Sequence, residues 1–341
     1  MAYLSFKKTL RAMKCCLPAA AKSKLFHTPS WVHFYLTRRC NLSCKYCHVK
    51  DNTKKDISTD EVKKIIDRLY YLGIRTIAFF GGEPTLRKDF CEILNYSVKK
   101  GIFTYFTTNG TLLNEEYIKN IAETGVDFIE LSVDSINVFE DSRKDYTRNK
   151  GVIDLLLKYK KLYDFALKTH IVLTNKNVDS VVETIKSINN RYDIPLTVGY
   201  ICRSVDKDFK DDESLFFNSK KSKEKLSKVI DEIIELKRKG AKIISPYSYF
   251  ESMKKFAFNE HSWACMAGKY SFSVDYNGLV QLCSAMKPYA VSVFEMDKDF
   301  FKNRWDEIEM TKKECTKVCF STCHNTTAQI IDNPIKYLFG K

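Results

Sequence analysis

The sequence feature that most constrains the fold is a regular alternation of short β-rich runs with amphipathic helical patterns. Runs rich in β-branched and aromatic residues begin at Trp31, Thr76, Phe103, Phe128, Leu167 and Leu196. Helix signals lie between them; the clearest helix has Ser58 as N-cap, Glu61 in the capping-box position and Gly73 as its stop. Strands that alternate with helices form a parallel sheet with right-handed crossovers, so the sequence predicts an α/β fold.

The same alternation divides the chain into three expected parts. Residues 1–30 form a basic amphipathic segment, residues 31–245 hold the six strands with their helices, and residues 246–341 form a small second domain in which cysteines return. In folds of this kind, functional residues collect in the loops that follow the C-terminal ends of the strands. Those loops are therefore the first place to look for a site.

Cysteine is the unusual component, with twelve among 341 residues. The chain shows neither a secretory signal pattern nor an apolar run of about 18 residues, so we expect a cytoplasmic protein. Abundant thiols in an unsecreted chain favour metal binding or catalysis over disulfides.

Three of these cysteines stand in the loop after the first predicted strand. Cys40, Cys44 and Cys47 give the spacing C-x3-C-x2-C. A loop of this length can wrap three thiolates around one corner of a four-iron cluster and leave one iron open. The alternative is a zinc site that uses these cysteines with His48, although zinc sites usually use paired knuckles.

This loop, with Tyr46 before its third cysteine, resembles that of the radical S-adenosylmethionine (SAM) superfamily. So does the GGEP run of Gly81, Gly82, Glu83 and Pro84 at the end of the second strand. The resemblance implies a partial (β/α)6 TIM-like barrel followed by a small iron–sulfur domain. It also implies a [4Fe–4S] cluster whose open iron is chelated by SAM, with the Gly82–Glu83 segment receiving the SAM ammonium group.

Polar residues at the next two strand ends match the superfamily by strand number. These are Thr108 and Asn109 after the third strand, and Ser132 and Asp134 after the fourth. The resemblance implies that they contact the carboxylate and ribose of SAM. From the residues alone, Asn109 is also a good turn residue and Asp134 a good cap. The implied reaction is reductive cleavage of SAM to a 5′-deoxyadenosyl radical, with the electron coming from a donor such as flavodoxin or ferredoxin.

A second group of cysteines follows residue 245. Cys265 and Cys283 flank a predicted β-hairpin that turns at Asn277-Gly278. The spacing resembles the auxiliary-cluster domains called SPASM or, in the shortened form, twitch, and implies a second [4Fe–4S] cluster. Two of three further cysteines would complete its ligands: Cys315, Cys319 and Cys323. A zinc ribbon stays open as the alternative, and Cys15, Cys16, Cys91 and Cys202 have no partner spacing.

The net charge of +14 is concentrated near the start of the chain, because no acidic residue precedes Asp51. One helical face of the N-terminal segment is apolar and comprises Tyr3, Phe6, Leu10, Met13 and Leu17. Basic residues surround this face, which is typical of a helix lying on anionic lipid. We therefore expect either peripheral attachment at the inner membrane surface or packing of this helix on the edge or base of the barrel.

The substrate is not defined by these motifs. The architecture is loosely similar to peptide-modifying maturases and to the hopanoid-type radical SAM enzymes that transfer the adenosyl group, so a peptide, a lipid or another small molecule is expected. Two other classes of function stay open. One is an iron–sulfur maturation or electron-transfer protein that does not cleave SAM. The other is a zinc-binding protein associated with nucleic acid, indicated by a pI near 9.1 but less expected.

Overall fold

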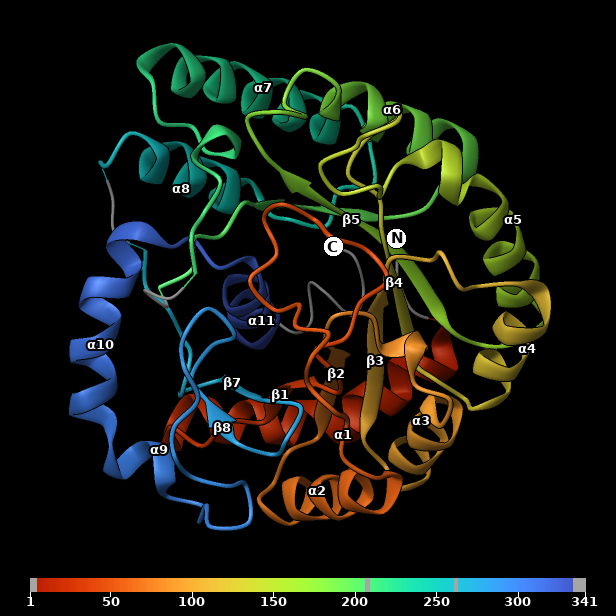
Figure 1. Ribbon diagram of the computed structural model, residues 1–341, viewed down its shortest axis with the longest axis vertical. Helices are drawn as coiled ribbons and strands as arrows, with labels where there is room; N and C mark the ends of the chain where they lie inside the picture. Colours follow the sequence, from red (N-terminus) through yellow and green to blue (C-terminus); the bar gives the residue numbers. More distant parts are fainter. Residues whose placement is uncertain (1–4, 206–208, 261–262, 334–341) are drawn as a thin grey trace.

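A computed structural model describes residues 5–205, 209–260 and 263–333. Its centre is one eight-stranded sheet in the order β6-β5-β4-β3-β2-β1-β7-β8, parallel throughout except for the last pair. Helices form an outer arc around these strands (Figure 1). The predicted α/β fold with a partial barrel is therefore confirmed. The strands are β1 (Trp31–Tyr35), β2 (Thr76–Phe80), β3 (Phe103–Thr108), β4 (Phe128–Ser132), β5 (Ala166–Leu173), β6 (Leu196–Tyr200), β7 (Ser271–Val274) and β8 (Val280–Gln281).

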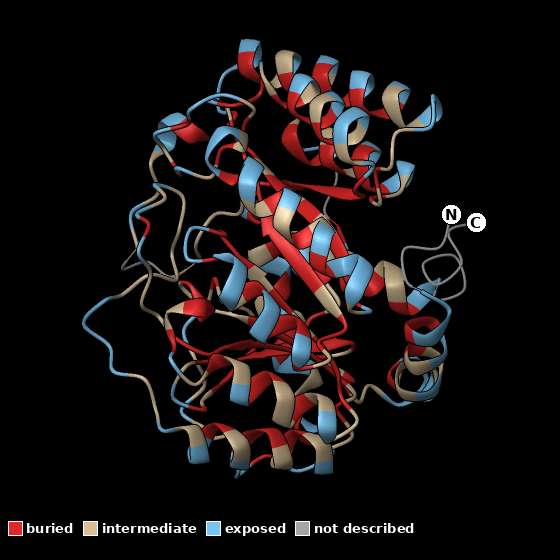
Figure 2. Ribbon diagram, turned by 90° about the vertical axis from the view of Figure 1, so that its right-hand side faces the viewer, coloured by how far each residue is buried: buried red, intermediate tan, exposed pale blue. Residues whose placement is uncertain are grey.

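The outer arc consists of the helices that connect successive strands. They are α2 (Thr59–Tyr71), α3 (Phe90–Lys99), α4 (Glu115–Glu123), α5 (Tyr146–Leu162), α6 (Val181–Tyr192) and α7 (Lys220–Arg238). Each buries one face against the sheet and leaves the other in water (Figure 2). The helix predicted from its caps is α2, where Ser58 and Glu61 form the expected capping box.

The core lies between the outward-facing strand residues and these helices. Phe34 and Phe79 are register partners on β1 and β2, both fully buried, with ring centroids 6.0 Å apart. Four residues of α2 at helical spacing are also buried, namely Val62, Ile65, Ile66 and Leu69. Burial of this apolar face contributes most of the stability of each βα unit.

The C-terminal part begins with α8 (Tyr247–Ala257) and contains the predicted hairpin, formed by β7 and β8 around Gly278 at φ +81°. β7 pairs in parallel with β1, so this part continues the sheet of the barrel beyond its first strand. Arg38 and Asp275 form a two-pronged ion pair with contacts of 3.1 and 2.7 Å, which ties the cysteine loop to the hairpin. The remaining elements are the short turns η1 (Pro84–Leu86) and η2 (Glu213–Leu215), and the helices α9 (Phe300–Asn303), α10 (Trp305–Val318) and α11 (Thr322–Asp332).

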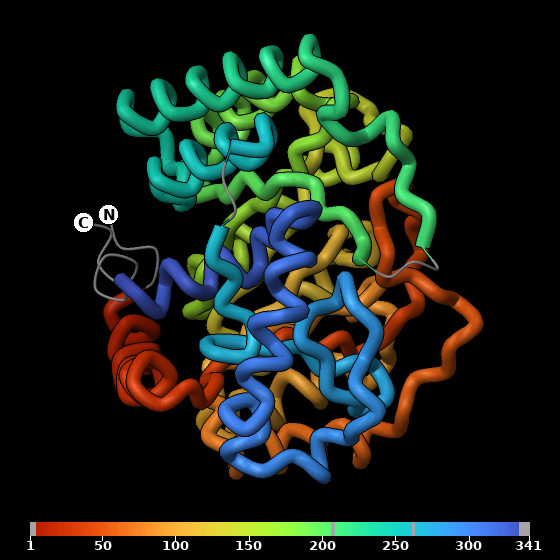
Figure 3. The backbone as a smooth tube through the Cα atoms, turned by 90° about the vertical axis from the view of Figure 1, so that its left-hand side faces the viewer, coloured from red at the N-terminus to blue at the C-terminus, as the bar shows by residue number. Residues whose placement is uncertain are grey.

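The N-terminal helix α1 (Phe6–Phe26) packs on the base of the barrel, on the opposite side of the molecule from the cysteine loop (Figure 3). Lys8 is buried, and its ammonium group meets the Asp127 carboxylate at 2.9 Å and the carbonyl oxygens of Gly125 and Val126 at 2.8 and 3.1 Å. Phe6 remains 81% exposed. Part of the basic face therefore turns toward the barrel, while part of the predicted apolar face is exposed to water. Tyr3, which was predicted to belong to the apolar face, lies outside the described residues.

Candidate functional site

The loop with the first three cysteines and the GGEP segment are joined by hydrogen bonds that extend the β1–β2 ladder past the sheet. Leu36 N–H donates to Phe80 O at 2.9 Å, and Gly82 N–H donates to Thr37 O at 2.8 Å. The Glu83 N–H then donates to the carbonyl oxygen of Arg39, also at 2.8 Å. The GGEP segment is thus fixed directly against the start of the cysteine loop.

The two glycines are required by this close approach. A Cβ on Gly82 would lie 2.5 Å from the carbonyl carbon of Arg39, and one on Gly81 would overlap the backbone of Thr37. Gly81 also has φ +152°, which side chains disfavour. The GGEP segment can therefore hold its place only without side chains at these two positions.

The Glu83 carboxylate organises the ends of two strands. It is 1% exposed and accepts hydrogen bonds from the hydroxyls of Thr85 and Thr108, at 2.6 and 2.8 Å, and from Asn109 N–H at 2.8 Å. Burial raises the pKa of Glu83, while these hydrogen bonds oppose the rise. Most of the acceptor capacity of the carboxylate is therefore used within the protein, so the backbone carbonyls of the segment are the freer acceptors for a cation.

Above this segment lies a cavity of about 620 Å³, part of it open to solvent. The structure brings most of the predicted site residues to its wall, whereas Pro84 and Asp134 are not among the residues that line it. The lining residues that the sequence singled out are Cys40, Cys44, Cys47, Tyr46, Gly81, Gly82, Glu83, Thr108, Asn109 and Ser132. Leu42, Phe80, Thr107 and Lys144 complete the wall.

Lys144 is a lining residue that the sequence reasoning missed. It precedes α5, its ammonium group lies 3.4 Å from the Asp134 carboxylate, and it stands 4.9 Å from the Tyr46 ring centroid. Burial alone would lower the pKa of Lys144, but Asp134 and the thiols of Cys44 and Cys47 raise it. Its charge is therefore retained inside the cavity, where it can attract an anion.

Asp134 supports the cavity wall from behind. Its carboxylate is fully buried and accepts hydrogen bonds from Tyr46 Oη at 2.5 Å and from Val172 N–H at 3.0 Å. These contacts, together with Lys144, occupy the carboxylate. Asp134 thus holds the Tyr46 ring beside the cysteines.

The three thiols face the cavity in a partly buried setting. Burial raises the pKa of Cys40, and it raises the pKa of Cys44 to about 11, although Lys144 opposes the latter shift. Cys47 N–H donates to Cys44 O at 3.0 Å, which closes a tight turn between these two thiols. Binding of iron takes thiolates and releases protons. Three soft ligands on a loop beside an open cavity fit a cluster that leaves one metal position free.

The structure also gathers cysteines at a second place, between the barrel and the C-terminal part. Cys202 Sγ lies 3.1 Å from Cys319 Sγ, and this contact raises the pKa of Cys319 well above its usual value. A hydrogen bond with Cys319 lowers the pKa of Cys315. Burial raises the pKa of Cys283, and its neighbours Cys202, Cys265 and Cys315 raise it further.

The sequence reasoning missed Cys202 because it belongs to no cysteine motif. The signal that could have found it is its place just after β6, at the same end of the barrel as the other candidate residues. Although part of the Cys323 side chain is accessible to solvent, desolvation by the atoms around it, together with Glu130 and Cys202, raises its pKa to about 12. Cys323 therefore lies near both the barrel interior and the second group of cysteines.

Six thiols thus belong to this second group, namely Cys202, Cys265, Cys283, Cys315, Cys319 and Cys323, which is more than the four that a thiolate-bound cluster takes. Among the described residues, however, no three His, Cys, Asp or Glu side chains converge closely enough to hold a single metal ion. Cys91 is set apart from both groups, on the surface of the core in α3.

Residues 34–188 match the sequence profile described as the Radical SAM superfamily. The chain is 37% identical over 126 residues to an Fe-coproporphyrin III synthase of Methanosarcina barkeri, covering 36% of this chain and 31% of that protein. It is 29% identical over 168 residues to a PqqA peptide cyclase of Bradyrhizobium diazoefficiens, covering 48% and 44%. The matched region is thus less than half the length of these relatives.

Two solved structures share the fold over a larger part of the chain. One is anSMEcpe with bound AdoMet, with a TM-score of 0.62, 20% identity, and coverage of 85% of this chain and 88% of that one. The other is Streptococcus suis SuiB bound to the precursor peptide SuiA, with a TM-score of 0.62, 16% identity, and coverage of 86% and 68%. In the described part of the chain, no helix is long and apolar enough to cross a membrane.

Proposed function

We propose that this chain, which belongs to the radical SAM superfamily through its residues 34–188, binds a [4Fe–4S] cluster at Cys40, Cys44 and Cys47 and cleaves SAM there. The observation that carries the assignment is the cavity in which these three thiols face the GGEP segment. A cluster bound there would supply the electron for reductive cleavage, delivered by a donor such as flavodoxin or ferredoxin. The chain's own residues bind SAM, orient it and exclude water from it.

The lining of the cavity supports a specific orientation of SAM. Backbone carbonyls of Gly81 and Gly82 would receive its ammonium group, because the Glu83 carboxylate is largely engaged by Thr85, Thr108 and Asn109. Lys144 would pair with its carboxylate, since it is the one cationic side chain at the cavity wall within the described part of the chain. Ser132 remains a candidate for the ribose, whereas the role of Asp134 would be to position Tyr46 and Lys144.

For the C-terminal part, residues 246–341, we propose a second, auxiliary cluster. Its ligands would be Cys265 and Cys283 from either end of the hairpin, with two or more from Cys315, Cys319 and Cys323. Cys202 joins this candidate set on the strength of its 3.1 Å contact with Cys319. A barrel residue among the ligands would couple the second cluster directly to the sheet that carries the first.

The organic substrate is a peptide, a lipid or another small molecule. A peptide is supported by two names: that of the PqqA peptide cyclase among the relatives, and that of SuiB bound to its precursor peptide among the similar folds. That of the Fe-coproporphyrin III synthase supports a small molecule instead. SAM cleavage is therefore the first property to establish, and candidate substrates can then be compared in the same assay.

An anaerobic, iron-reconstituted preparation tests both cluster assignments. We expect about eight irons per chain and formation of 5′-deoxyadenosine after reduction. Cys44→Ala should abolish cleavage and retain about four irons, while Cys202→Ala should lose auxiliary iron and keep its SAM-cleaving cluster. Cys91→Ala is the matched control and should keep both. If the fully loaded, reduced protein forms no 5′-deoxyadenosine, the chain is an electron-transfer or maturation protein and the proposal is wrong.

We also propose that α1 touches an anionic membrane at the inner surface. Its outer side combines exposed Phe6 and Leu10 with the exposed Lys7 and Lys14, which supports weak apolar and electrostatic attachment. The double variant Phe6→Ser with Leu10→Ser should reduce sedimentation with anionic vesicles. Equal sedimentation of the variant and the unchanged protein would exclude this contact.

A further inference from the structure

The barrel contains a second cavity, at the end opposite the cysteine loop. Its wall includes the first residue of each of β1 to β4, namely Trp31, Thr76, Phe103 and Phe128. Helices α1 and α11 close it from outside, with Ala12 and Ala20 on one and Thr327, Ile330 and Ile331 on the other. The space between these elements, together with the open solvent at its mouth, amounts to about 1130 Å³.

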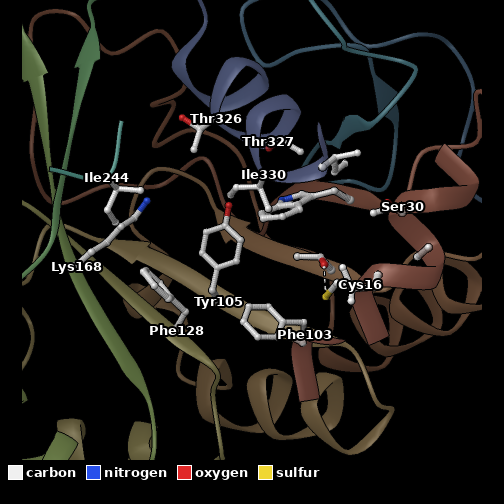
Figure 4. A pocket seen from close by; sticks show the side chains of 17 residues that line it. Cys16, Ser30, Phe103, Tyr105, Phe128, Lys168, Ile244, Thr326, Thr327 and Ile330 are labelled. Carbon is white, nitrogen blue, oxygen red and sulfur yellow. Dashed lines mark hydrogen bonds between the residues drawn. The ribbon is translucent and has the colours of Figure 1, made fainter. Parts of the chain in front are cut away.

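The lining of this base cavity is almost entirely hydrocarbon and aromatic. Tyr105 stands in its middle, between Phe128 and Lys168 on one side and Phe103 and Cys16 on the other (Figure 4). Small alanines on α1 create the space, since larger residues there would fill it. Ligand pockets in proteins are concave and mostly apolar, so this partly open apolar space is a candidate for a ligand.

Lys168 is the only charged side chain on the wall among the described residues, and its charge is compensated. Its Nζ lies 2.5 Å from Glu130 Oε2. Burial opposes ionisation of Glu130, but Lys168 and His170 lower its pKa to about 2. The inner end of the cavity is therefore neutral overall and offers no unpaired cation for an acidic headgroup.

Side chains that line the base cavity contact side chains that line the cavity with the three cysteines. Tyr105 lines the base cavity, and Phe80 lines the cavity with the three cysteines. The two rings meet edge-on, with their centroids 6.0 Å apart. Glu130 links Lys168 below to the Thr107 hydroxyl above, the latter at 2.8 Å. A molecule in the base cavity would end directly beneath the cysteine site.

We propose that the base cavity binds a single flexible hydrocarbon chain, of the kind carried by fatty acids and by isoprenoid alcohols. The apolar end lies against Tyr105 and Phe128, and the polar head stays at the mouth between α1 and α11. Binding is driven by the removal of apolar surface from water on both partners. Binding of the chain does not depend on SAM cleavage, because no residue lines both the base cavity and the cavity with the three cysteines.

Titration with cis-parinaric acid, a fluorescent fatty acid of 18 carbons, tests the proposal on the full-length protein. We expect saturable binding that palmitic acid or farnesol displaces, and the more effective competitor identifies the class of chain. Ala20→Phe places an aromatic ring inside the cavity and should weaken binding by at least about tenfold, a change of 1.4 kcal/mol. Ala21→Phe is the matched control, because Ala21 is the exposed neighbour on the same helix.

Ala19→Phe, at another lining position of α1, serves if the first variant does not fold. Each variant is checked by its circular dichroism spectrum and by 5′-deoxyadenosine formation, which should stay unchanged. Equal binding by the unchanged protein and both lining variants would refute the cavity as the site, as would equal loss in Ala21→Phe. Absence of saturable binding by the unchanged protein would refute the proposal outright, whether or not SAM is cleaved.

Discussion

The backbone of Arg39 leaves no room for a side chain on Gly82, so a single methyl group there probes the whole arrangement of the cysteine cavity. In Gly82→Ala, the new Cβ would lie 2.5 Å from the Arg39 carbonyl carbon, about 1 Å inside the 3.4 Å at which ordinary contact begins. The GGEP segment would have to withdraw by a comparable distance. Withdrawal breaks two hydrogen bonds of 2.8 Å, from Gly82 N–H to Thr37 and from Glu83 N–H to Arg39.

The size of the effect follows from these contacts. Overpacking costs about 1–3 kcal/mol, and two lost hydrogen bonds cost about 0.5–1.5 kcal/mol each. We therefore expect the free energy of unfolding to fall by about 2–6 kcal/mol, measured by urea denaturation. Because a shift of about 1 Å in a positioning group costs on the order of a hundredfold in rate, SAM cleavage should fall by about that factor.

Gly151→Ala provides the matched control with the opposite sign. Gly151 lies within α5, and a Cβ there would meet nothing within 4 Å. Alanine should stabilise this helix by about 0.5–1 kcal/mol and leave SAM cleavage unchanged. If Gly82→Ala proves as stable and as active as Gly151→Ala, the close approach of the two loops does not determine the site, and the reasoning fails.

Three further changes test other parts of the molecule. Lys144→Met should weaken SAM binding by about tenfold or more while cluster iron is retained, as measured by equilibrium dialysis; unchanged affinity would remove Lys144 from the SAM site. Asp127→Asn leaves Lys8 buried without its counter-charge and should lower the free energy of unfolding by about 3 kcal/mol, whereas an unchanged midpoint in urea would contradict a firmly packed α1. Glu130 has a pKa of about 2 in the folded state, below its unfolded value, so its contribution is present above pH 4.5 and lost as the pH falls. Stability should drop by about 2 kcal/mol between pH 6 and pH 3 from this group, and Glu130→Gln should remove that part of the slope.

The fold was predictable because strands and helices leave local patterns in the sequence. The parallel sheet follows from six β-rich runs at helix-length spacing, and the cysteine loop stands after the first run. The sequence also predicts that the carboxyl ends of β1 to β4 lie close together, since parallel strands end on one edge of the sheet. The hairpin around Gly278 was predicted by the same local reasoning, from its alternating residues and turn.

Contacts between distant segments were not predictable in this way. The thiol of Cys202 meets Cys319 across 117 positions of sequence, and neither residue carries a pattern that names the other. Lys144 is one lysine among many, and only its place beside Asp134 and Tyr46 makes it a candidate for binding SAM. The pairing of β7 with β1 likewise joins the two predicted domains through one sheet, which no composition boundary reveals.

The N-terminal helix shows why amphipathic pattern alone misjudges a basic helix. The pattern counts Lys8 and Arg11 as solvent-facing, yet Asp127 is fully buried at the base of the barrel and attracts both, at 2.9 and 3.0 Å. Arg11 also donates hydrogen bonds to the carbonyl oxygens of Val98 and Ile102, near the same base of the barrel. Removal of α1 would therefore take away both cations that pair with Asp127, leave it only the hydrogen bond from Thr104 N–H at 2.8 Å, and open the base cavity. A membrane contact of this protein must then be tested with surface substitutions such as Phe6→Ser, because a truncated chain would differ in its core as well as in its surface.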